Sequence, residues 1–211
     1  LLALGAAAVL SLGLMAGCGS SDQSSSSGSG KTYKIGIVQL VEHNALDAAN
    51  KGFVDGLKER GFEEGKNITI DRQNAQADQS NLQNIAQRFV SAKMDLICTI
   101  ATPAAQTMAN ATHDIPIVGT AITDYEGAKL VSSNKEPKGN VTGTSDMNPV
   151  KEQIDLLLKI KPDAKTIGTV YCSSEVNSEV QVKAMKEYAE SKGLTVKVAT
   201  ISTVNDIQQA A

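Results

Sequence analysis

Hydrophobic and polar positions follow two alternating patterns from Lys34 onward. Compact β-branched runs such as "YKIGIVQL" are followed by segments in which apolar residues recur every three or four positions. Regular alternation of strand and helix predicts right-handed βαβ units. We therefore expect an α/β fold in which parallel sheets are flanked by helices on both faces.

The pattern predicts a first lobe at 32–146 and the start of a second lobe at 147–211. First-lobe strands are expected at 33–40, 67–75, 94–100, 115–123 and 141–145, with helices at 41–61, 78–92 and 103–111. Asn44 is expected to cap the first helix and Gly61 to end it. The pattern restarts at Pro149 with a helix, a strand at 165–172, a polar turn at 173–179, a helix to Gly193 and a strand at 194–200. This weak internal repeat favours two lobes of one design.

The first 31 residues differ from the rest. Residues 1–17 are apolar and uncharged and end in small side chains, which is typical of an export signal. Residues 18–31 are rich in Ser and Gly and predict a flexible tether. No initiator Met or basic region precedes Leu1, and a helical pattern still runs at Ala211, so we expect a fragment of a longer protein.

Cys18 follows Met-Ala-Gly directly and resembles the lipobox cysteine of bacterial lipoproteins. The resemblance implies lipidation of Cys18 and a protein anchored to the extracytoplasmic face of the cell membrane. The alternative is an unmodified Cys18 after a plain secretory signal.

Charge and composition exclude several classes of function. The net charge is -3 without long runs of one sign, which argues against a nucleic-acid partner. Cys18, Cys98 and Cys172 form no CxxC pair, and His43 and His113 have no partner at ligand spacing, so no metal is expected. We expect Cys98 and Cys172 to be free thiols. The motifs GxGxxG, GxxxxGK[ST] and GxSxG are absent, so we expect neither an enzyme nor a cofactor.

Candidate binding chemistry lies where strands end, because ligands of open parallel sheets bind beyond the carboxyl ends of the strands. These segments are 41–44, 101–104, 121–124 and 172–177. Thr102 is a suitable N-cap and Pro103 a suitable first helical residue, which would leave the N–H groups of Ala104 and Ala105 free for a carboxylate. The alternative is an ordinary capped helix.

Other polar residues at strand ends offer complementary contacts. Ser173, Ser174 and Asn177 offer hydrogen bonds, and Asp124, Asp146 or Glu175 could hold an ammonium group. Singly, each acid could equally be a solvated loop residue or a cap. His43 could contact a ligand or be merely solvated. Tyr125 and Tyr171 are the nearby rings that could stack on an aromatic ligand.

Six segments carry a family likeness along the chain from Lys34: "KIGIVQLVEHNALDAANKGFVDGL", "EEGKNITIDRQNAQADQSNLQNIAQRFV", "IATPAAQ", "IPIVGTAITD", "GNVTGTSDMNPVKEQIDLL" and "VYCSSEVNS". In this order the chain resembles the ABC-transporter substrate-binding lipoproteins of tryptophan/tyrosine-type uptake systems. The resemblance implies a two-lobed periplasmic-binding-protein fold of type I, with the second lobe incomplete here. It also implies hinge closure around a ligand and delivery to a membrane permease.

The resemblance also implies a set of ligand-binding residues in the cleft between the lobes. They are Glu42, His43, Asn44, Thr102, Pro103, Ala104, Thr123, Asp124, Asp146, Ser173, Ser174, Glu175 and Asn177. By analogy, Thr102 and the N–H of Ala104 would bind the carboxylate of an aromatic amino acid, and Asp146 or Glu175 its ammonium group. A monomer is expected. The alternatives are a sugar or nucleoside binder of the same fold, or a non-transport sensor or adhesin.

Overall fold

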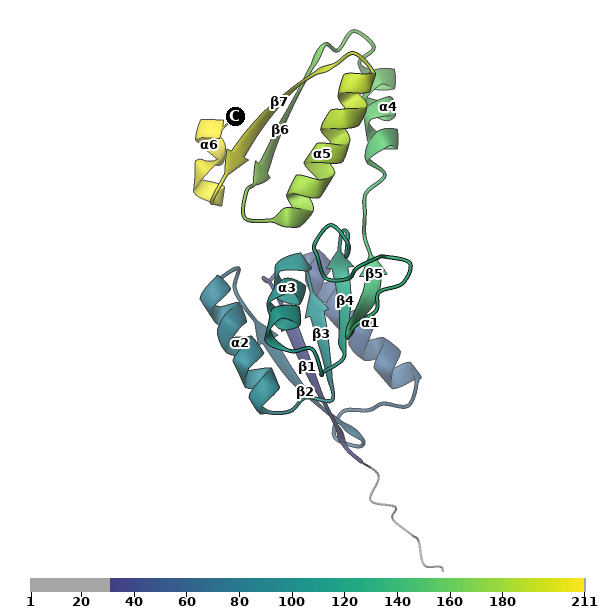
Figure 1. The fold of residues 1–211 in the computed structure, drawn as a ribbon, viewed down its shortest axis with the longest axis vertical. Coiled ribbons are helices and arrows are strands. Elements are labelled where there is room, and N and C mark those ends of the chain that lie inside the picture. Colours follow the sequence, from purple (N-terminus) through teal and green to yellow (C-terminus); the bar gives the residue numbers. More distant parts are fainter. Residues whose placement is uncertain (1–30, 211) are drawn as a thin grey trace, which may run out of the picture. The chain divides into compact units, whose positions relative to one another are not determined.

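The computed structural model describes residues 31–210, which form two parallel sheets flanked by helices (Figure 1). The predicted export signal at 1–17, the candidate lipidation site Cys18 and nearly all of the predicted tether lie outside these residues. Within the described range, no helix combines the length and apolar character needed to cross a membrane. The same range contains no cluster of His, Cys, Asp and Glu that could hold a metal ion.

The larger sheet has five parallel strands in the order β2-β1-β3-β4-β5. Its strands are β1 (Tyr33–Gln39), β2 (Ile68–Asn74), β3 (Leu96–Ile100), β4 (Ile117–Ile122) and β5 (Val141–Ser145). Every predicted strand of the first lobe is therefore confirmed. Because the strands are parallel, all their carboxyl ends lie at one edge of the sheet.

Three helices cover the larger sheet: α1 (Asn44–Glu59), α2 (Gln79–Ser91) and α3 (Thr102–Ala111). The apolar residues of α1 pack against one face, while those of α2 and α3 pack against the other (Figure 1). Phe89 of α2 is fully buried beneath Gly36 of β1, where a Cβ atom would lie 2.7 Å from the aromatic ring. Gly61 follows α1 with φ +83° and ends it, as predicted.

The starts of two helices differ from prediction. His43, not Asn44, caps α1, because its backbone is extended and its Nδ1 accepts a hydrogen bond from the N–H of Ala45 at 3.2 Å. Asn44 is already the first helical residue. Ala101, not Thr102, is the N-cap of α3, and Pro103 is the second helical residue. The N–H of Ala101 still binds the Thr120 carbonyl of β4 at 3.1 Å, so the chain turns from sheet to helix at this one residue.

A second, two-stranded parallel sheet pairs β6 (Thr166–Cys172) with β7 (Thr195–Ile201). Its helices are α4 (Val150–Ile160), α5 (Val176–Ser191) and the short α6 (Ile207–Ala210) after a 3₁₀ turn at Val204–Asp206. Its small core is built around Ile154, Ala189 and Leu194. The predicted polar turn at 173–179 is shorter than expected. The Glu175 carbonyl already accepts the first helical hydrogen bonds, so α5 begins at Val176.

Candidate ligand-binding site

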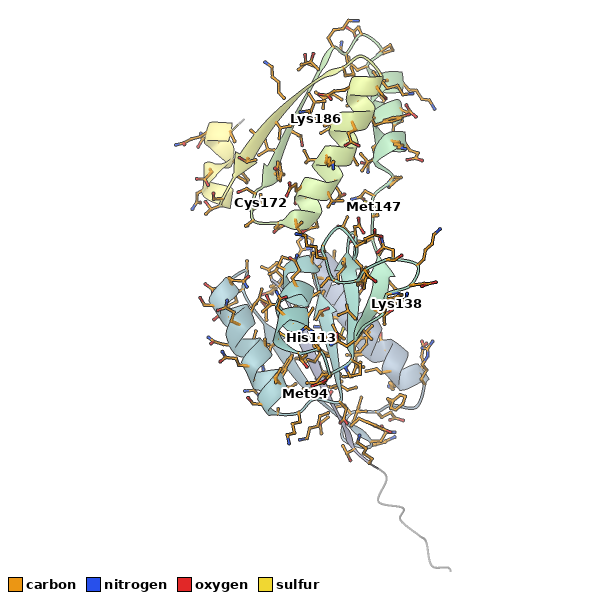
Figure 2. All side chains as sticks on the ribbon, in the orientation of Figure 1. Met94, His113, Lys138, Met147, Cys172 and Lys186 are labelled. Carbon is orange, nitrogen blue, oxygen red and sulfur yellow. The ribbon has the colours of Figure 1, made fainter. Side chains whose placement is uncertain are left out.

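The candidate residues of the larger sheet all follow carboxyl ends of its strands. Glu42, His43 and Asn44 follow β1, and the residues after β3, β4 and β5 reach the same edge. These are Thr102, Pro103, Ala104, Thr123, Asp124 and Asp146. The fold therefore brings together segments more than 100 residues apart in the sequence (Figure 1). His113 lies instead beyond the end of α3, toward the opposite edge (Figure 2).

The start of α3 is unusual in its backbone and its burial. Ala101 has φ +87° and ψ 151°, a region that is adopted essentially only by glycine. Its carbonyl accepts the N–H of Ala105 at 3.2 Å, so the expectation of a free N–H at Ala105 is wrong. The N–H of Ala104 has no acceptor within the described residues, but Ala104 is 0% and Thr102 2% exposed. The N–H that could bind an anion thus lies below the surface.

Backbone strain extends along this edge. Gln76 and Ala77, which follow β2, have φ of +55° and +57°, and Ala121 near the end of β4 has φ +54°. Ala121 belongs to an irregularity in the pairing of β4 with β5 between Gly119 and Ile122. Strained non-glycine residues cluster at ligand sites in folded proteins. The positive φ angles of Gln76, Ala77 and Ala121 therefore also favour a ligand site at the carboxyl edge of the sheet. The hydrophobic pattern of the sequence does not reveal them.

The two acids at this edge have different surroundings. The Oδ1 of Asp124 accepts hydrogen bonds from the N–H of Glu126 at 3.1 Å and the side-chain amide of Asn134 at 2.9 Å. The hydrogen bond from Asn134 is the largest cause that lowers the pKa of Asp124. Asp146 is exposed, and its carboxylate makes no hydrogen bond or ion pair within the described residues. Asp124 therefore holds its own loop together, while Asp146 is open to a partner.

The candidate residues nearby differ in how far they are buried. The Thr123 carbonyl accepts a hydrogen bond from the Ser145 hydroxyl at 2.6 Å, and Thr123 is 5% exposed. Glu42, His43 and Asn44 are all exposed. Because Nδ1 of His43 caps α1, its Nε2 is the ring nitrogen that remains for a ligand.

The remaining candidates follow β6 in the smaller sheet. The N–H and hydroxyl of Ser173 both donate to the Ile201 carbonyl, at 2.9 and 3.3 Å. Glu175 occupies the N-cap of α5, and its carboxylate lies 3.5 Å from the Ser178 hydroxyl. Asn177 lies in the first turn of α5, and its Oδ1 is buried without a hydrogen-bond partner in the described part of the chain. The hydroxyl of Ser174 lies 3.1 Å from Cys172 Sγ.

The two thiols of the described chain are free, as expected, but differ in environment. Cys98 of β3 is buried, and burial raises the pKa of its thiol to about 12. Cys172, at the carboxyl end of β6, is only partly buried (Figure 2).

The two tyrosine rings expected near a ligand also differ. Tyr125 is 6% exposed, and its hydroxyl donates to the Gly119 carbonyl at 2.8 Å, with the Thr144 carbonyl at 3.2 Å. Burial, followed by the charge of Asp146, raises the pKa of Tyr125 to about 12. The ring of Tyr125 therefore belongs to the core and is not an open surface on which a ligand could stack in this conformation. Tyr171 of β6 is partly buried.

One polar residue at this edge was not expected from the sequence. Gln39 is the last residue of β1 and is 4% exposed, and its side-chain amide has hydrogen bonds on both its nitrogen and its oxygen. A glutamine next to the end of the otherwise apolar run "IGIVQL" is the sequence signal that could have identified it.

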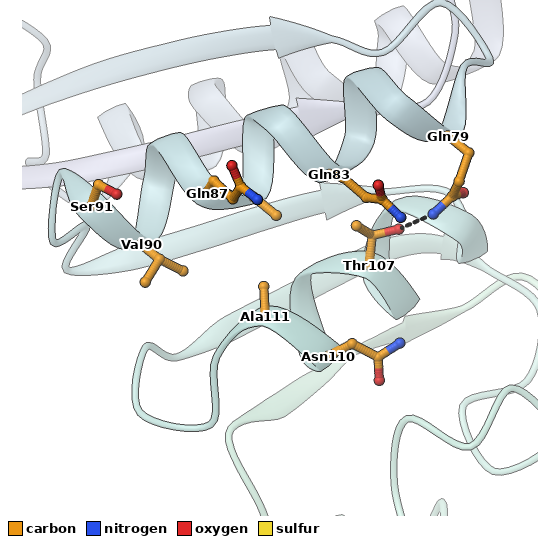
Figure 3. Close-up of a pocket in the computed structure, with 9 residues that line it drawn as sticks. Gln79, Gln83, Gln87, Val90, Ser91, Thr107, Asn110 and Ala111 are labelled. Carbon is orange, nitrogen blue, oxygen red and sulfur yellow. Dashed lines mark hydrogen bonds between the residues drawn. The ribbon is translucent and has the colours of Figure 1, made fainter.

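A groove of about 570 Å³ lies elsewhere, between α2 and α3 (Figure 3). Its polar lining is uncharged and consists mainly of amide side chains. Gln79 of α2 donates a hydrogen bond to the Thr107 hydroxyl of α3 at 3.2 Å and so joins the two helices. None of the candidate ligand residues lines this groove.

A parallel sheet with polar loops at its carboxyl edge, backed by a closed apolar core, is the arrangement in which α/β proteins bind small molecules. Residues 34–211 match the family model described as ABC transporter substrate binding protein, and the chain belongs to this family. The predicted family is thereby confirmed. The family consists of substrate-binding proteins rather than enzymes, as expected from the sequence.

Relatives of known name or structure agree with this assignment. The tyrosine-binding protein of Clostridioides difficile (strain R20291) is 45% identical over 216 residues, which cover 100% of this chain and 63% of the relative. A crystal structure of the ABC domain in complex with L-Trp from Streptococcus pneumonia is 44% identical with a TM-score of 0.81, and the match covers 85% of this chain and 61% of that one. The ligand-free, open structure of a substrate binding protein with adhesive properties from Clostridium difficile is 52% identical with a TM-score of 0.65. The match covers 84% of this chain and 60% of that one.

The chain therefore spans about three fifths of the length of these relatives. Over that part its fold matches structures of the type I periplasmic-binding-protein class, so the predicted fold class is confirmed.

Proposed function

We propose that this chain belongs to the extracytoplasmic solute-binding component of an ABC importer and that its ligand is an aromatic amino acid. The observation that carries the proposal is the 45% identity, along the whole chain, to a protein named for tyrosine binding. The similar structure in complex with L-Trp supports the same ligand class.

The proposal includes the organisation of the whole protein. Residues 32–146 and 147–211 contribute to two lobes, and the ligand lies in the cleft between them. Residues 1–17 form a signal peptide, Cys18 carries the lipid anchor, and 18–31 form the tether to the membrane. The partner is a membrane permease, and the binding protein acts as a monomer.

Within the site, the ligand carboxylate binds Thr102 and the N–H of Ala104, and Asp146 or Glu175 binds the ammonium group. The missing acceptor for the Ala104 N–H supports the first contact, since a buried donor at a helix start favours an anion. Because Ala104 is buried, this contact requires the side chains that cover it to move on binding. The exposed, unengaged carboxylate of Asp146 supports the second contact.

The flanking candidates complete the site with polar contacts. In this proposal the site is also lined by Glu42, His43, Asn44, Pro103, Thr123, Asp124, Ser173, Ser174 and Asn177. The buried, unpartnered Oδ1 of Asn177 supports its inclusion, because an unpaired buried acceptor is costly until a donor reaches it.

A second candidate function is adhesion, in addition to solute binding. It is favoured by the 52% identity to a substrate binding protein described as having adhesive properties.

The proposed function is tested by thermal unfolding and calorimetry of the full-length protein without residues 1–18. We expect L-Tyr, L-Trp or L-Phe to raise the melting temperature, since a ligand at a hundredfold excess over its Kd adds about 2.7 kcal/mol of stability. Tyramine, which lacks the carboxylate, and 3-(4-hydroxyphenyl)propionate, which lacks the ammonium group, should each bind much more weakly than L-Tyr. Binding of sugars or nucleosides alone would overturn the aromatic amino-acid assignment.

A further inference from the structure

The buried amide of Gln39 connects three parts of the carboxyl edge. Its Nε2 donates to the Val41 carbonyl at 2.8 Å and to Oδ1 of Asp47 at 2.6 Å. Its Oε1 accepts a hydrogen bond from the side-chain amide of Asn50 at 3.1 Å. The end of β1, the segment after it and the first turns of α1 are therefore joined through one side chain.

The sequence position of Gln39 makes these bonds specific rather than incidental. Ile35, Ile37 and Gln39 point to the same face of the sheet, toward α1, and the two isoleucines are fully packed there. An apolar side chain would also fill the third position. A buried amide costs free energy unless its donors and its acceptor are hydrogen-bonded. What the amide of Gln39 adds, compared with an apolar side chain, is one defined conformation of the groups that it binds.

The conformation that Gln39 defines is that of the short segment 41–43. Gln39 binds this segment at the Val41 carbonyl, and its other end is fixed where His43 caps α1. Asp47, the second partner of Gln39, donates its own N–H to the His43 carbonyl at 2.9 Å. Glu42 lies between the two fixed points, exposed to solvent.

We propose that Gln39 is a positioning residue for the ligand site, which fixes the segment 41–43 so that Glu42 and His43 are aligned before the ligand arrives. This inference rests on the proposed function. Gln39 itself need not touch the ligand, because it acts through the Val41 carbonyl and Asp47. A site that is aligned in advance binds more tightly, since apparent affinity falls in proportion to the fraction of competent molecules.

The test compares Gln39→Met with Gln73→Met in the full-length protein without residues 1–18. Methionine keeps the length of glutamine and removes its hydrogen bonds. Gln73 is the matched control, because its side chain lies one strand away in β2 and binds Asp71 at 2.6 Å instead of the segment 41–43. Calorimetry with L-Tyr and L-Trp gives Kd, and hydrogen exchange of the Ala45 amide, which binds His43, reports the order of the segment.

We expect Gln39→Met to raise Kd about tenfold and to accelerate hydrogen exchange at Ala45 in the ligand-free protein. A tenfold rise corresponds to a variant in which only about one tenth of the molecules hold the binding-competent conformation. Gln73→Met should change Kd less than twofold. Among partner variants, Asp47→Asn keeps an acceptor oxygen and should retain most of the affinity, whereas Asp47→Ala should not.

An unchanged Kd in Gln39→Met would overturn the proposal. So would equal losses of affinity in Gln39→Met and Gln73→Met at equal melting temperatures, because they would show a general loss of stability. A wild-type protein that binds no aromatic amino acid overturns the proposed function instead. In that case hydrogen exchange of the Ala45 amide alone tests whether Gln39 orders the segment 41–43. An exchange rate in Gln39→Met equal to that of the wild type would overturn the role of Gln39.

Discussion

Removal of one hydroxyl group tests the assignment of Tyr125 to the core. In Tyr125→Phe the ring stays but the hydroxyl that binds the Gly119 carbonyl is lost. This carbonyl lies at the start of the irregularity in the pairing of β4 with β5, between Gly119 and Ile122. The space is tight, because a Cβ atom on Gly143 would clash with the same hydroxyl.

The expected cost follows from burial. A buried acceptor left without its donor costs about 1–3 kcal/mol, and each kcal/mol lowers the melting temperature of a domain of this size by roughly 2–4 °C. The pH dependence gives a second, independent measure. The folded pKa of about 12 lies above the ordinary value of 10, so the stability linked to the phenol is complete below pH 10 and is lost as pH rises toward 12. That loss amounts to about 3 kcal/mol.

Denaturant unfolding at neutral pH and across the alkaline range measures both effects. Tyr33→Phe is the matched control, because Tyr33 is 40% exposed and packs edge-on against Phe62 through its ring. It should change stability by less than about 0.5 kcal/mol. The reasoning is refuted if both variants lose equal stability, or if Tyr125→Phe keeps the full alkaline sensitivity of the wild type.

Three further predictions concern the backbone, the core and the ligand. Ala101→Gly should raise the free energy of unfolding by about 1 kcal/mol in denaturant titration, because glycine relieves the strain at φ +87°; a loss of stability would contradict this strain. Gly36→Ala should cost about 1–3 kcal/mol, because its methyl group meets the ring of Phe89, and Phe89→Leu in the same chain should recover part of the loss. Asp146→Asn or Glu175→Gln should weaken binding of L-Tyr at least tenfold in calorimetry without lowering the melting temperature of the ligand-free protein; two variants with normal affinity would exclude both acids as the ammonium partner.

Most of the fold could be predicted because each element has its own periodic signal. The α2 pattern, for example, placed Phe89 and its apolar neighbours on one face, and these side chains are buried. Helix starts were harder, because a cap depends on the backbone angles of one residue. Histidine capped α1 in place of the neighbouring asparagine, and Ala101 took a conformation that no propensity scale assigns to alanine.

The candidate site could be predicted as an edge but not as a set of contacts. Parallel pairing alone places the strand ends together, so the segments were identified correctly. Whether a polar side chain is free depends on partners that lie on another turn or element, several residues along the chain. Asp124 accepts a hydrogen bond from Asn134, and the hydroxyl of Tyr125 reaches the Gly119 carbonyl across the bulge. Gln39 stands out in its apolar strand, but the sequence does not show that its partner is Asp47 in α1.

The contrast between the two thiols gives a practical route to observing the second sheet. The thiolate is the reactive species, and at neutral pH the buried Cys98, with its pKa of about 12, stays protonated and shielded. A maleimide fluorophore added to protein without Cys18 should therefore attach to Cys172 in preference to Cys98. The dye would then sit one residue before Ser173, where its emission could follow the arrival of a ligand in real time.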